Sequence, residues 1–556
     1  MQKTSGIGIL QLAAITDQLG ATLAILDNNA FRYPIDAIRQ SIKEETSVWT
    51  CSKCKQAIDP RFKFCPACGQ SLDTAKEQKI LQRNDWDVIG ISGLTTQYKF
   101  IKQILPVCRE EYPDAVIVGG GGFISSMPRE MMKWLPQLSI GCIGESYITW
   151  REILGNVETQ DWKHVKGLVY REGKKIKLST MRPLIPEDKL DEEIPWPAYE
   201  FSPVDTYLMN SAMPYAPEFM PNINYMPRRL DVLTAYGCAY TCSFCFHNGC
   251  TPFCQGQIYG KQVTGKPFRQ HSPDYVINLI THLRMTYGID RVSFIDENMC
   301  SNKKWFMEFL DKLEESGLAT LIKWGMVCHT RTVDAQLLQK AHDCGLAYVS
   351  YGGETSNERL LKQIGKGQNK EQMSAAIQAT QAAGINAIMS FIIGFPDQNV
   401  DDIMEDLQFF IDNQIHTIPF FLQPYCGSKL FSVYKDKIIE QGMTADETEF
   451  LVNPTLDLYY KVFGKETVVP SLVSIAKNLP LMTDKIKDAV LERWILSLDD
   501  ATRLSVNLTK FNDVELTGLR YMLSTDLQDV TAKFWDMERL KKFKKELEQR
   551  RDTRQL

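Results

Sequence analysis

The chain has 556 residues, of which 44% are hydrophobic and 24% are charged, and its formal net charge is −5. This composition is that of a globular protein with about three or four domains, and the negative charge argues against a general nucleic-acid binder. No apolar run reaches the roughly 18 residues of a membrane span, and the N-terminus lacks a signal-peptide pattern, so we expect a cytoplasmic protein. In that reducing compartment, 15 cysteines favour metal or radical chemistry over disulfides.

Residues 1–150 alternate between short apolar runs and helical patterns. The expected strands cover residues 20–29, 87–96, 114–122 and 139–146. Apolar residues at helical spacing fill residues 97–113 between two of them. Buried strands separated by helices predict an α/β domain with a doubly wound parallel sheet. Because the chain opens almost directly on a helix, we expect the first strand of this sheet to be missing, with a start codon assigned too late as the alternative.

The carboxyl ends of these strands are rich in small and polar residues. They carry Thr95, Gly120, Gly121, Gly144 and Glu145. A doubly wound sheet binds its ligand at this edge, and glycine lets a bulky ligand approach the backbone closely. We therefore predict a cofactor-binding edge here, with ordinary turn chemistry as the alternative for each single glycine.

Residues 51–68 interrupt the domain with two C-x2-C pairs separated by ten residues. The four cysteines are Cys51, Cys54, Cys65 and Cys68. Four thiolates at this spacing suit tetrahedral zinc, whose binding contributes on the order of 10 kcal/mol and can fold a short insertion without a core. We predict a structural zinc ion, with a rubredoxin-like iron site or four unrelated free cysteines as the alternatives.

The chain beyond residue 150 divides into three parts. Residues 151–230 are proline-rich and predict an irregular connecting segment, and helical patterns dominate residues 436–556. Between them, residues 231–435 repeat the alternation of strand and helix, which predicts a partial (β/α)6 barrel with its chemistry at the carboxyl ends of the strands. The six expected strands cover residues 231–238, 291–299, 322–330, 347–354, 386–396 and 416–425.

Three cysteines at the spacing C-x3-C-x2-C follow the first barrel strand. These are Cys238, Cys242 and Cys245, with Phe244 before the last. Three thiolates leave one iron of a 4Fe–4S cluster without a protein ligand, and an open iron can chelate a small molecule and pass it an electron. A zinc site is the alternative.

This spacing, with Phe244, closely resembles that of the radical S-adenosylmethionine (radical SAM) superfamily. The resemblance implies that S-adenosylmethionine chelates the open iron and is cleaved to methionine and a 5′-deoxyadenosyl radical, which abstracts hydrogen from unactivated carbon. It also implies an electron donor such as flavodoxin or ferredoxin.

Two further motifs fit the superfamily. Gly352, Gly353 and Glu354 end the fourth barrel strand and resemble the motif that holds S-adenosylmethionine. Asp296 and Glu297 end the second strand and resemble a frequent acidic pair, for which we predict a catalytic role. Polar capping of the barrel strands is the alternative for this pair.

The stretch FIIGFPDQN around Gly394 resembles the fifth-strand motif near the adenine. Relatives often have Gly-Glu after the proline, whereas this chain has Asp397 and Gln398. We therefore do not transfer the function of the relatives' glutamate to this chain. Arg331 ends the third strand at the same mouth of the barrel. Polar capping of the strand is again the alternative to a function in the site.

A doubly wound sheet before a radical SAM barrel resembles the cobalamin-binding branch, over roughly residues 7–435. The resemblance implies that the corrin lies between the edge of the sheet and the barrel mouth. The first histidine is His164, so the sheet offers no histidine ligand to cobalt, which is compatible with this branch. A domain that serves only as a scaffold is the alternative.

We therefore expect a cobalamin-dependent enzyme that methylates an unactivated carbon of a small-molecule or peptide substrate. Radical oxidative cyclisation or rearrangement without methyl transfer is the alternative in the same class. A non-catalytic metal-knuckle interaction protein is the alternative from another class. Methylthiolation of tRNA would require cysteines for a second cluster and a basic RNA-binding module, and the sequence favours neither.

Overall fold

The computed structural model describes residues 6–27, 35, 38–39, 47–50, 57–58, 76–79, 86–209, 228–245, 252–398, 400–413, 416–422 and 425–433. The chain divides into two compact units, and one boundary runs through strand β13 (Lys323–Cys328), between Trp324 and Gly325. None of the helices in the described ranges combines the length and the hydropathy of a membrane span.

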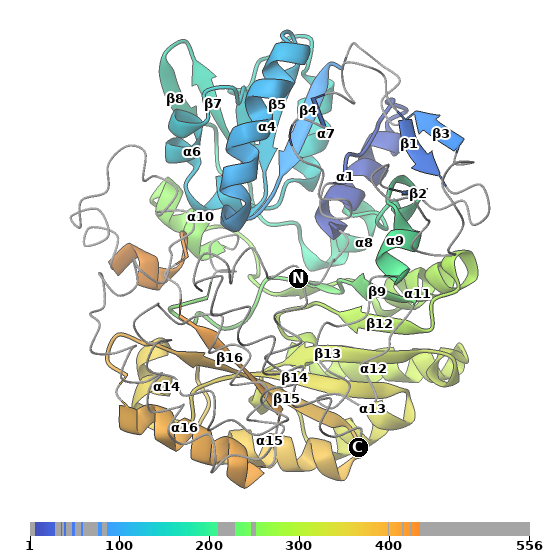
Figure 1. Ribbon diagram of the computed structural model, residues 1–556, viewed down its shortest axis with the longest axis vertical. Helices are drawn as coiled ribbons and strands as arrows, with labels where there is room; N and C mark the ends of the chain where they lie inside the picture. The colour runs from blue at the N-terminus through green and yellow to red at the C-terminus, as the bar shows by residue number, and fades with distance from the viewer. Residues whose placement is uncertain are drawn as a thin grey trace, which may run out of the picture. The chain divides into compact units, whose positions relative to one another are not determined.

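The first unit contains a five-stranded sheet of order β4-β5-β6-β7-β8 (Figure 1). Strands β4, β5 and β6 run parallel, which confirms the strands expected within residues 87–96, 114–122 and 139–146, whereas β7 and β8 are added antiparallel. The strands are β4 (Val88–Ser92), β5 (Val116–Gly120), β6 (Ile140–Cys142), β7 (Leu168–Glu172) and β8 (Lys175–Leu178).

Helices cover both faces of this sheet, as the doubly wound expectation requires. Val116 and Val118 of β5 share a buried cluster with Ile153 of α7. The next residue on the opposite face, Gly119, leaves so little room that a Cβ atom would lie 2.9 Å from Ile124 of α5. The helices of this region are α1 (Ile7–Gln18), α4 (Tyr98–Glu111), α5 (Gly122–Ser126), α6 (Pro128–Trp134), α7 (Tyr147–Gly155), α8 (Leu190–Glu193) and α9 (Val204–Met209).

Two sequence expectations for the first unit were wrong. Residues 21–27, part of the run expected as a strand at 20–29, form no strand, and the sheet order starts with β4. An apolar run becomes a strand only where a neighbour pairs its backbone groups. Conversely, residues 151–230 are not irregular throughout, because β7 and β8 form a hairpin turned at Gly173, whose φ of 58° suits glycine.

A small antiparallel sheet of order β2-β1-β3 stands in the inserted region. Its strands are β1 (Ser47–Thr50), β2 (Ala57–Ile58) and β3 (Lys76–Lys79). The four cysteines predicted to bind zinc lie outside the described residues, and so does the helical region expected at 436–556. Both expectations therefore stay predictions.

The second sheet has the order β16-β15-β14-β13-β12-β9. Each strand neighbours its predecessor in the chain, and the pairings of β9 with β12, β14 with β15 and β15 with β16 are parallel, which confirms the expected (β/α)6 arrangement. Strands β9 (Arg229–Val232) and β12 (Arg291–Phe294) belong to the first unit; β14 (Leu346–Glu354), β15 (Asn386–Ile393) and β16 (His416–Phe421) belong to the second.

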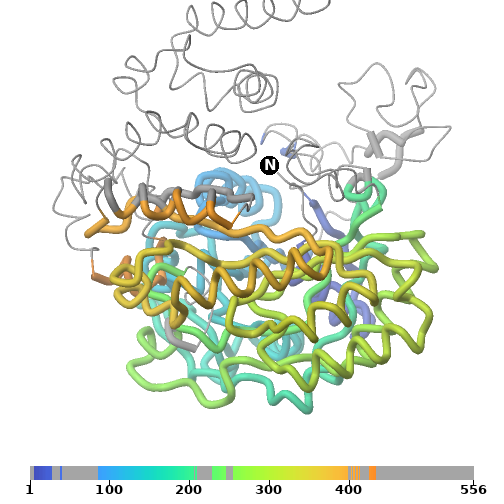
Figure 2. The backbone as a smooth tube through the Cα atoms, turned by 90° about the horizontal axis from the view of Figure 1, so that it is seen from below, coloured from blue at the N-terminus to red at the C-terminus, as the bar shows by residue number. Residues whose placement is uncertain are grey.

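Helices separate these strands along the chain. Within the second unit, α15 contacts both α13 and α16, and the three run side by side, yellow to orange in Figure 2. The helices are α10 (Pro252–Tyr259), α11 (Pro273–Tyr287), α12 (Lys303–Glu315), α13 (Ala335–Asp343), α14 (Glu358–Ile364), α15 (Lys370–Ala382) and α16 (Val400–Asn413). A short two-stranded ladder of β10 (Ala235–Tyr236) and β11 (Arg269–Gln270) flanks the segment that carries the cysteine triad.

Candidate active site

The cysteine loop, residues 237–245, leaves the end of β10. It starts at Gly237, whose φ is 79° and where a Cβ atom would collide with the carbonyl oxygen of Pro267, so glycine is needed. The N–H of Cys245 donates to the carbonyl of Cys242 at 3.1 Å. Cys242 is buried, and Cys238 is half-buried like Cys245. One short loop thus carries all three predicted cluster ligands.

No three His, Cys, Asp or Glu side chains of the described residues gather around a point that could hold a single metal ion. Cluster ligation makes a different demand on the loop, because each thiolate binds its own iron atom. The donor set therefore fits a cluster, and the partial exposure of two of the thiols leaves room for one.

Asp296 lies directly behind the start of this loop. Its Oδ1 accepts hydrogen bonds from the backbone N–H groups of Thr234 and Ala235, at 2.7 and 2.5 Å. The residue is 1% exposed, and burial raises the pKa of its carboxyl group to about 7. Asp296 thus fixes the bend that leads into Cys238, while Glu297 beside it is half-buried. The catalytic role predicted for this pair stays a prediction.

Glu145 and Gly144 connect the N-terminal sheet to the flanks of the cysteine loop. The Glu145 carboxylate forms an ion pair with Arg269 of β11, one contact being 3.0 Å, and Arg269 is 1% exposed. Gly144 has a φ of 76°, and a Cβ atom there would overlap the buried side chain of Gln255 on α10. The predicted cofactor edge therefore contacts two elements that follow the loop, of which β11 pairs with the strand that leads into it.

The loops after β4 and β5 form the rest of that edge. Thr95 is fully buried, and its Oγ1 has no hydrogen-bond partner among the described residues. Gly121 has a φ of 79°, and a Cβ atom there would lie 2.8 Å from the carbonyl oxygen of Gly93. Gly120 faces open space, and Leu94 is 48% exposed. The unpaired hydroxyl of Thr95, the free space beside Gly120 and the exposed side chain of Leu94 suit an edge that a bulky, partly apolar ligand covers.

In the second unit, Glu354 ends β14 in a strained conformation. Its φ is 66°, which is uncommon for a residue with a side chain and marks sites that the surroundings must hold in place. Lys366 donates to its Oε1 at 2.8 Å, and Ser390 of β15 donates to Oε2 at 3.4 Å. A Cβ atom on Gly352 would lie 2.5 Å from the Lys366 ammonium nitrogen, so glycine makes room for this ion pair.

The stretch GGETSNERLLKQIGKG, residues 352–367, resembles one branch of the superfamily, but sequence reasoning predicted no role for any residue of the loop at 365–369, which carries Lys366. Gln368 donates to the carbonyls of Gly352 and Gly353 at 3.0 and 3.1 Å, and its Oε1 accepts from Thr330 at 2.8 Å. Gln368 and Lys366 are both at least nine-tenths buried. The sequence signal that could have indicated this loop is GKGQN, in which Lys366 and Gln368 follow the glycine that ends a helix.

His329 and Arg331 hold the same loop from the end of β13. The Nε2 of His329 lies 2.9 Å from the carbonyl oxygen of Lys366, and burial lowers the pKa of this histidine to about 4. It is therefore neutral at neutral pH and donates from Nε2, while Nδ1 accepts from the N–H of Arg331. The guanidinium of Arg331 donates to the carbonyl of Gly367 at 2.8 Å, which is the polar capping given above as its alternative.

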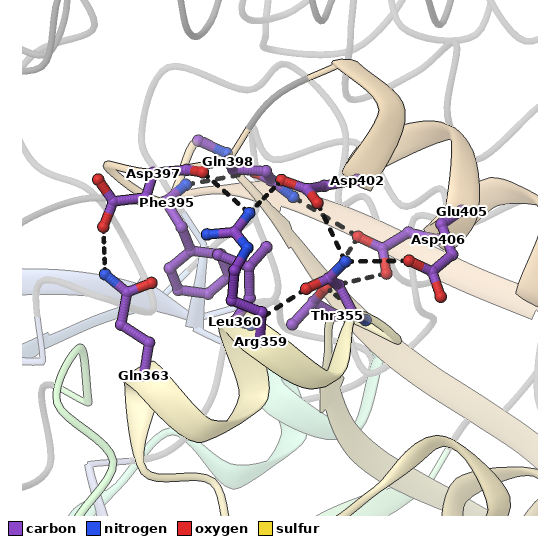
Figure 3. Close-up of polar contacts among 12 residues, drawn as sticks. Thr355, Arg359, Leu360, Gln363, Phe395, Asp397, Gln398, Asp402, Glu405 and Asp406 are labelled. Atoms are coloured by element: carbon purple, nitrogen blue, oxygen red, sulfur yellow. Dashed lines mark hydrogen bonds and ion pairs between the residues drawn. The ribbon is translucent and has the colours of Figure 1, made fainter.

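The loop after β15 shows what Gln398 does in place of the usual glutamate. Its Oε1 accepts from the backbone N–H groups of Gly394 and Phe395, at 2.6 and 3.3 Å, and the residue is 2% exposed (Figure 3). Asp397 is exposed and accepts a hydrogen bond from Gln363. A neutral amide oxygen therefore closes this turn, and the neighbouring carboxylate lies outside it.

The sequence profile of the radical SAM superfamily matches residues 232–410. An uncharacterized methyltransferase of Pyrococcus horikoshii is 26% identical over 371 residues, which cover 66% of this chain and 74% of that protein. An anaerobic magnesium-protoporphyrin IX monomethyl ester cyclase of Cereibacter sphaeroides is 23% identical over 401 residues, 70% of this chain and 60% of the cyclase. The solved structure of the radical S-adenosylmethionine methyltransferase TsrM from Kitasatospora setae, with cobalamin and a [4Fe-4S] cluster bound, is similar with a TM-score of 0.56 and 13% identity over 80% of this chain and 77% of TsrM.

The profile, the cysteine loop and the strand order together identify residues 232–410 as a radical SAM domain, and the chain as a radical SAM enzyme. The fold, in which a doubly wound sheet precedes the six-stranded sheet of the barrel, is similar to that of TsrM.

Proposed function

We propose that this enzyme methylates an unactivated carbon of a small-molecule or peptide substrate, with cobalamin as the methyl carrier. The observation that carries the proposal is the link between the edge of the N-terminal sheet and the cysteine loop within one unit. Glu145 extends from that edge to Arg269, which pairs with Tyr236 two residues before Cys238. A methyl carrier bound at the edge would therefore keep a constant position relative to a cluster bound by the loop.

Cys238, Cys242 and Cys245 would hold a 4Fe–4S cluster, which when bound supplies the electron that cleaves S-adenosylmethionine to a 5′-deoxyadenosyl radical. The protein's own contribution is orientation. Asp296 fixes the entrance of the loop, and Lys366 holds Glu354 in its strained conformation. Rigid support of this kind keeps reacting atoms within about 3–4 Å of each other and excludes competing reactions.

Thr95, Gly120 and Gly121 would hold cobalamin, which when bound supplies the methyl group. The buried hydroxyl of Thr95 offers a hydrogen bond that the described residues leave unmade, and Gly120 leaves space for a large ring. Similarity to an uncharacterized methyltransferase of Pyrococcus horikoshii supports methyl transfer.

A structural zinc ion in the inserted region is part of the proposal. Strands β1 and β2 pair antiparallel through Thr50 and Ala57, so a short hairpin flanks the first cysteine pair in the sequence. Pairs of cysteines separated by two residues are typical ligands of structural zinc sites such as zinc ribbons. The proposed ligands are Cys51, Cys54, Cys65 and Cys68.

Radical cyclisation without methyl transfer is the second candidate, because the cyclase of Cereibacter sphaeroides is similar over 70% of this chain. The two candidates differ in what they release from S-adenosylmethionine. Radical cleavage yields 5′-deoxyadenosine in both, whereas methyl transfer to reduced cobalt also yields S-adenosylhomocysteine.

The test uses protein purified anaerobically from cells supplied with cobalamin, then given S-adenosylmethionine and a low-potential reductant. Methylation predicts that both products accumulate, and that Cys242→Ala abolishes 5′-deoxyadenosine formation while cobalt stays bound. 5′-Deoxyadenosine alone would overturn methyl transfer in favour of cyclisation or rearrangement. Neither product from wild-type protein with its cluster intact would overturn both candidates.

A further inference from the structure

Asp406 of α16 is a buried carboxyl group for which neither the proposed reaction nor the sequence motifs account. It is fully buried, and donors surround it. The hydroxyl of Thr355 lies 2.9 and 3.0 Å from its two oxygens, and both the hydroxyl of Ser356, at 2.8 Å, and the Ser356 N–H donate to Oδ1. Asp406 therefore anchors the two residues that follow Glu354.

Gln398 connects the same carboxylate to the loop after β15. Its Oε1 accepts from Gly394 and Phe395, and its Nε2 lies 3.5 Å from Oδ2 of Asp406 (Figure 3). An amide is suited to this position because it accepts on one side and donates on the other. A glutamate would accept from the same backbone groups but would face Asp406 with a second carboxylate in a buried site.

We propose that Asp406 and Gln398 form a clasp that positions the loops after β14 and β15 as one unit for binding S-adenosylmethionine. This inference rests on the proposed function, because it assumes that these two strand ends bind S-adenosylmethionine. Asp406 is a positioning residue: it acts through Thr355, Ser356 and Gln398. The clasp also explains why glutamine stands at position 398, where relatives often have glutamate. Asp406 of α16 already supplies the carboxylate, so its partner must donate a hydrogen bond.

The pair can be tested by exchanging its two groups. In Gln398→Glu two carboxylates face each other, and in Asp406→Asn two amides do, so that one donor meets another. The double variant Gln398→Glu/Asp406→Asn restores one carboxylate and one amide. The carboxylate introduced at position 398 would accept from Gly394 and Phe395. The amide introduced at position 406 would donate to that carboxylate, while its oxygen accepts from Ser356.

The readouts are the affinity for S-adenosylmethionine, by equilibrium dialysis of the anaerobically reconstituted enzyme, and the thermal unfolding midpoint. We expect each single variant to bind about tenfold more weakly and to unfold at a lower temperature, and the double variant to recover most of both losses. Gln408→Ala is the matched control, because Gln408 is exposed on the helix that carries Asp406 and donates to Asp412 of that same helix at 2.7 Å. It should bind like wild type.

Single variants that bind like wild type, or a double variant whose losses are the sum of the single ones, would overturn the clasp. Failure of the proposed function looks different, because wild-type protein with an intact cluster would then not bind S-adenosylmethionine. In that case the unfolding midpoints still decide whether Asp406 and Gln398 are coupled.

Discussion

At the residue scale, Asp296 follows β12 by two residues and Glu354 ends β14, and both use carboxylate oxygens to bind the protein itself. Asp296 accepts two backbone N–H groups in front of the cysteine loop, and Glu354 accepts from Lys366. Buried carboxylates that accept hydrogen bonds in this way set the shape of a site, and removing their partners leaves a buried polar group uncompensated.

The Asp296 carboxyl group should give the enzyme a measurable pH dependence of stability. Burial raises its pKa from 3.8 to about 7, so the folded chain binds more protons than the unfolded chain between these values, and its contribution to stability falls as the pH rises through this window. Asp296→Asn keeps the acceptor for Thr234 and Ala235. We expect its unfolding midpoint to depend less on pH than that of wild type between about pH 5 and 7.

Thermal unfolding of wild type and Asp296→Asn across this pH range checks the expectation. An unfolding midpoint that depends equally on pH in both proteins would contradict it. The same variant tests the predicted catalytic role: a positioning residue predicts that Asp296→Asn still forms 5′-deoxyadenosine, whereas loss of that product with the cluster intact would assign Asp296 to the chemistry.

The ion pair of Lys366 and Glu354 should matter for both stability and binding. Their side chains are 11% and 9% exposed, so Lys366→Met leaves a buried carboxylate without its cation. We expect the free energy of unfolding to fall by about 3 kcal/mol and the affinity for S-adenosylmethionine to fall about tenfold. Lys362→Met, on the exposed face of α14, is the control. Wild-type affinity in Lys366→Met would show that the pair is not needed to shape the site.

At the element scale, Gly144 and helix α10 couple the N-terminal sheet to the cysteine loop. Gly144→Ala adds a methyl group where the backbone has a φ of 76° and where Gln255 already occupies the space. We expect a loss of more than about 1 kcal/mol of stability and a lower cobalt content per chain. Gly173→Ala isolates the backbone effect, since its φ is 58° and no atom lies within 4 Å of its Cβ position.

Adding Gln255→Ala to Gly144→Ala should recover part of the loss, because it removes the collision but keeps the backbone strain. Cobalt analysis and unfolding midpoints of the three variants provide the measurement. Equal losses of cobalt and of unfolding midpoint in Gly144→Ala and Gly173→Ala would mean that the contact with Gln255 contributes nothing to either.

At the scale of the whole molecule, the sequence predicted most of the strands of both sheets because buried parallel strands are uninterrupted apolar runs. It missed the β7–β8 hairpin, where Lys175 and Lys177 of the edge strand are polar, and it predicted a strand at 20–29, where the described residues 21–27 form none. The cysteine loop was readable because its chemistry lies within eight residues. Gln398 and Asp406 were not, because the hydrogen bonds of Asp406 reach residues 50 and 51 positions away.

The most direct measurement of the central claim is the metal content of wild-type protein purified anaerobically from cells supplied with cobalamin. The account predicts about four iron atoms and one cobalt atom per chain, with about one zinc atom bound by the inserted cysteines. Iron without cobalt would contradict the assignment of the glycine-rich edge to cobalamin and with it methyl transfer. Protein that binds no iron after cluster reconstitution would contradict the account of the cysteine loop itself.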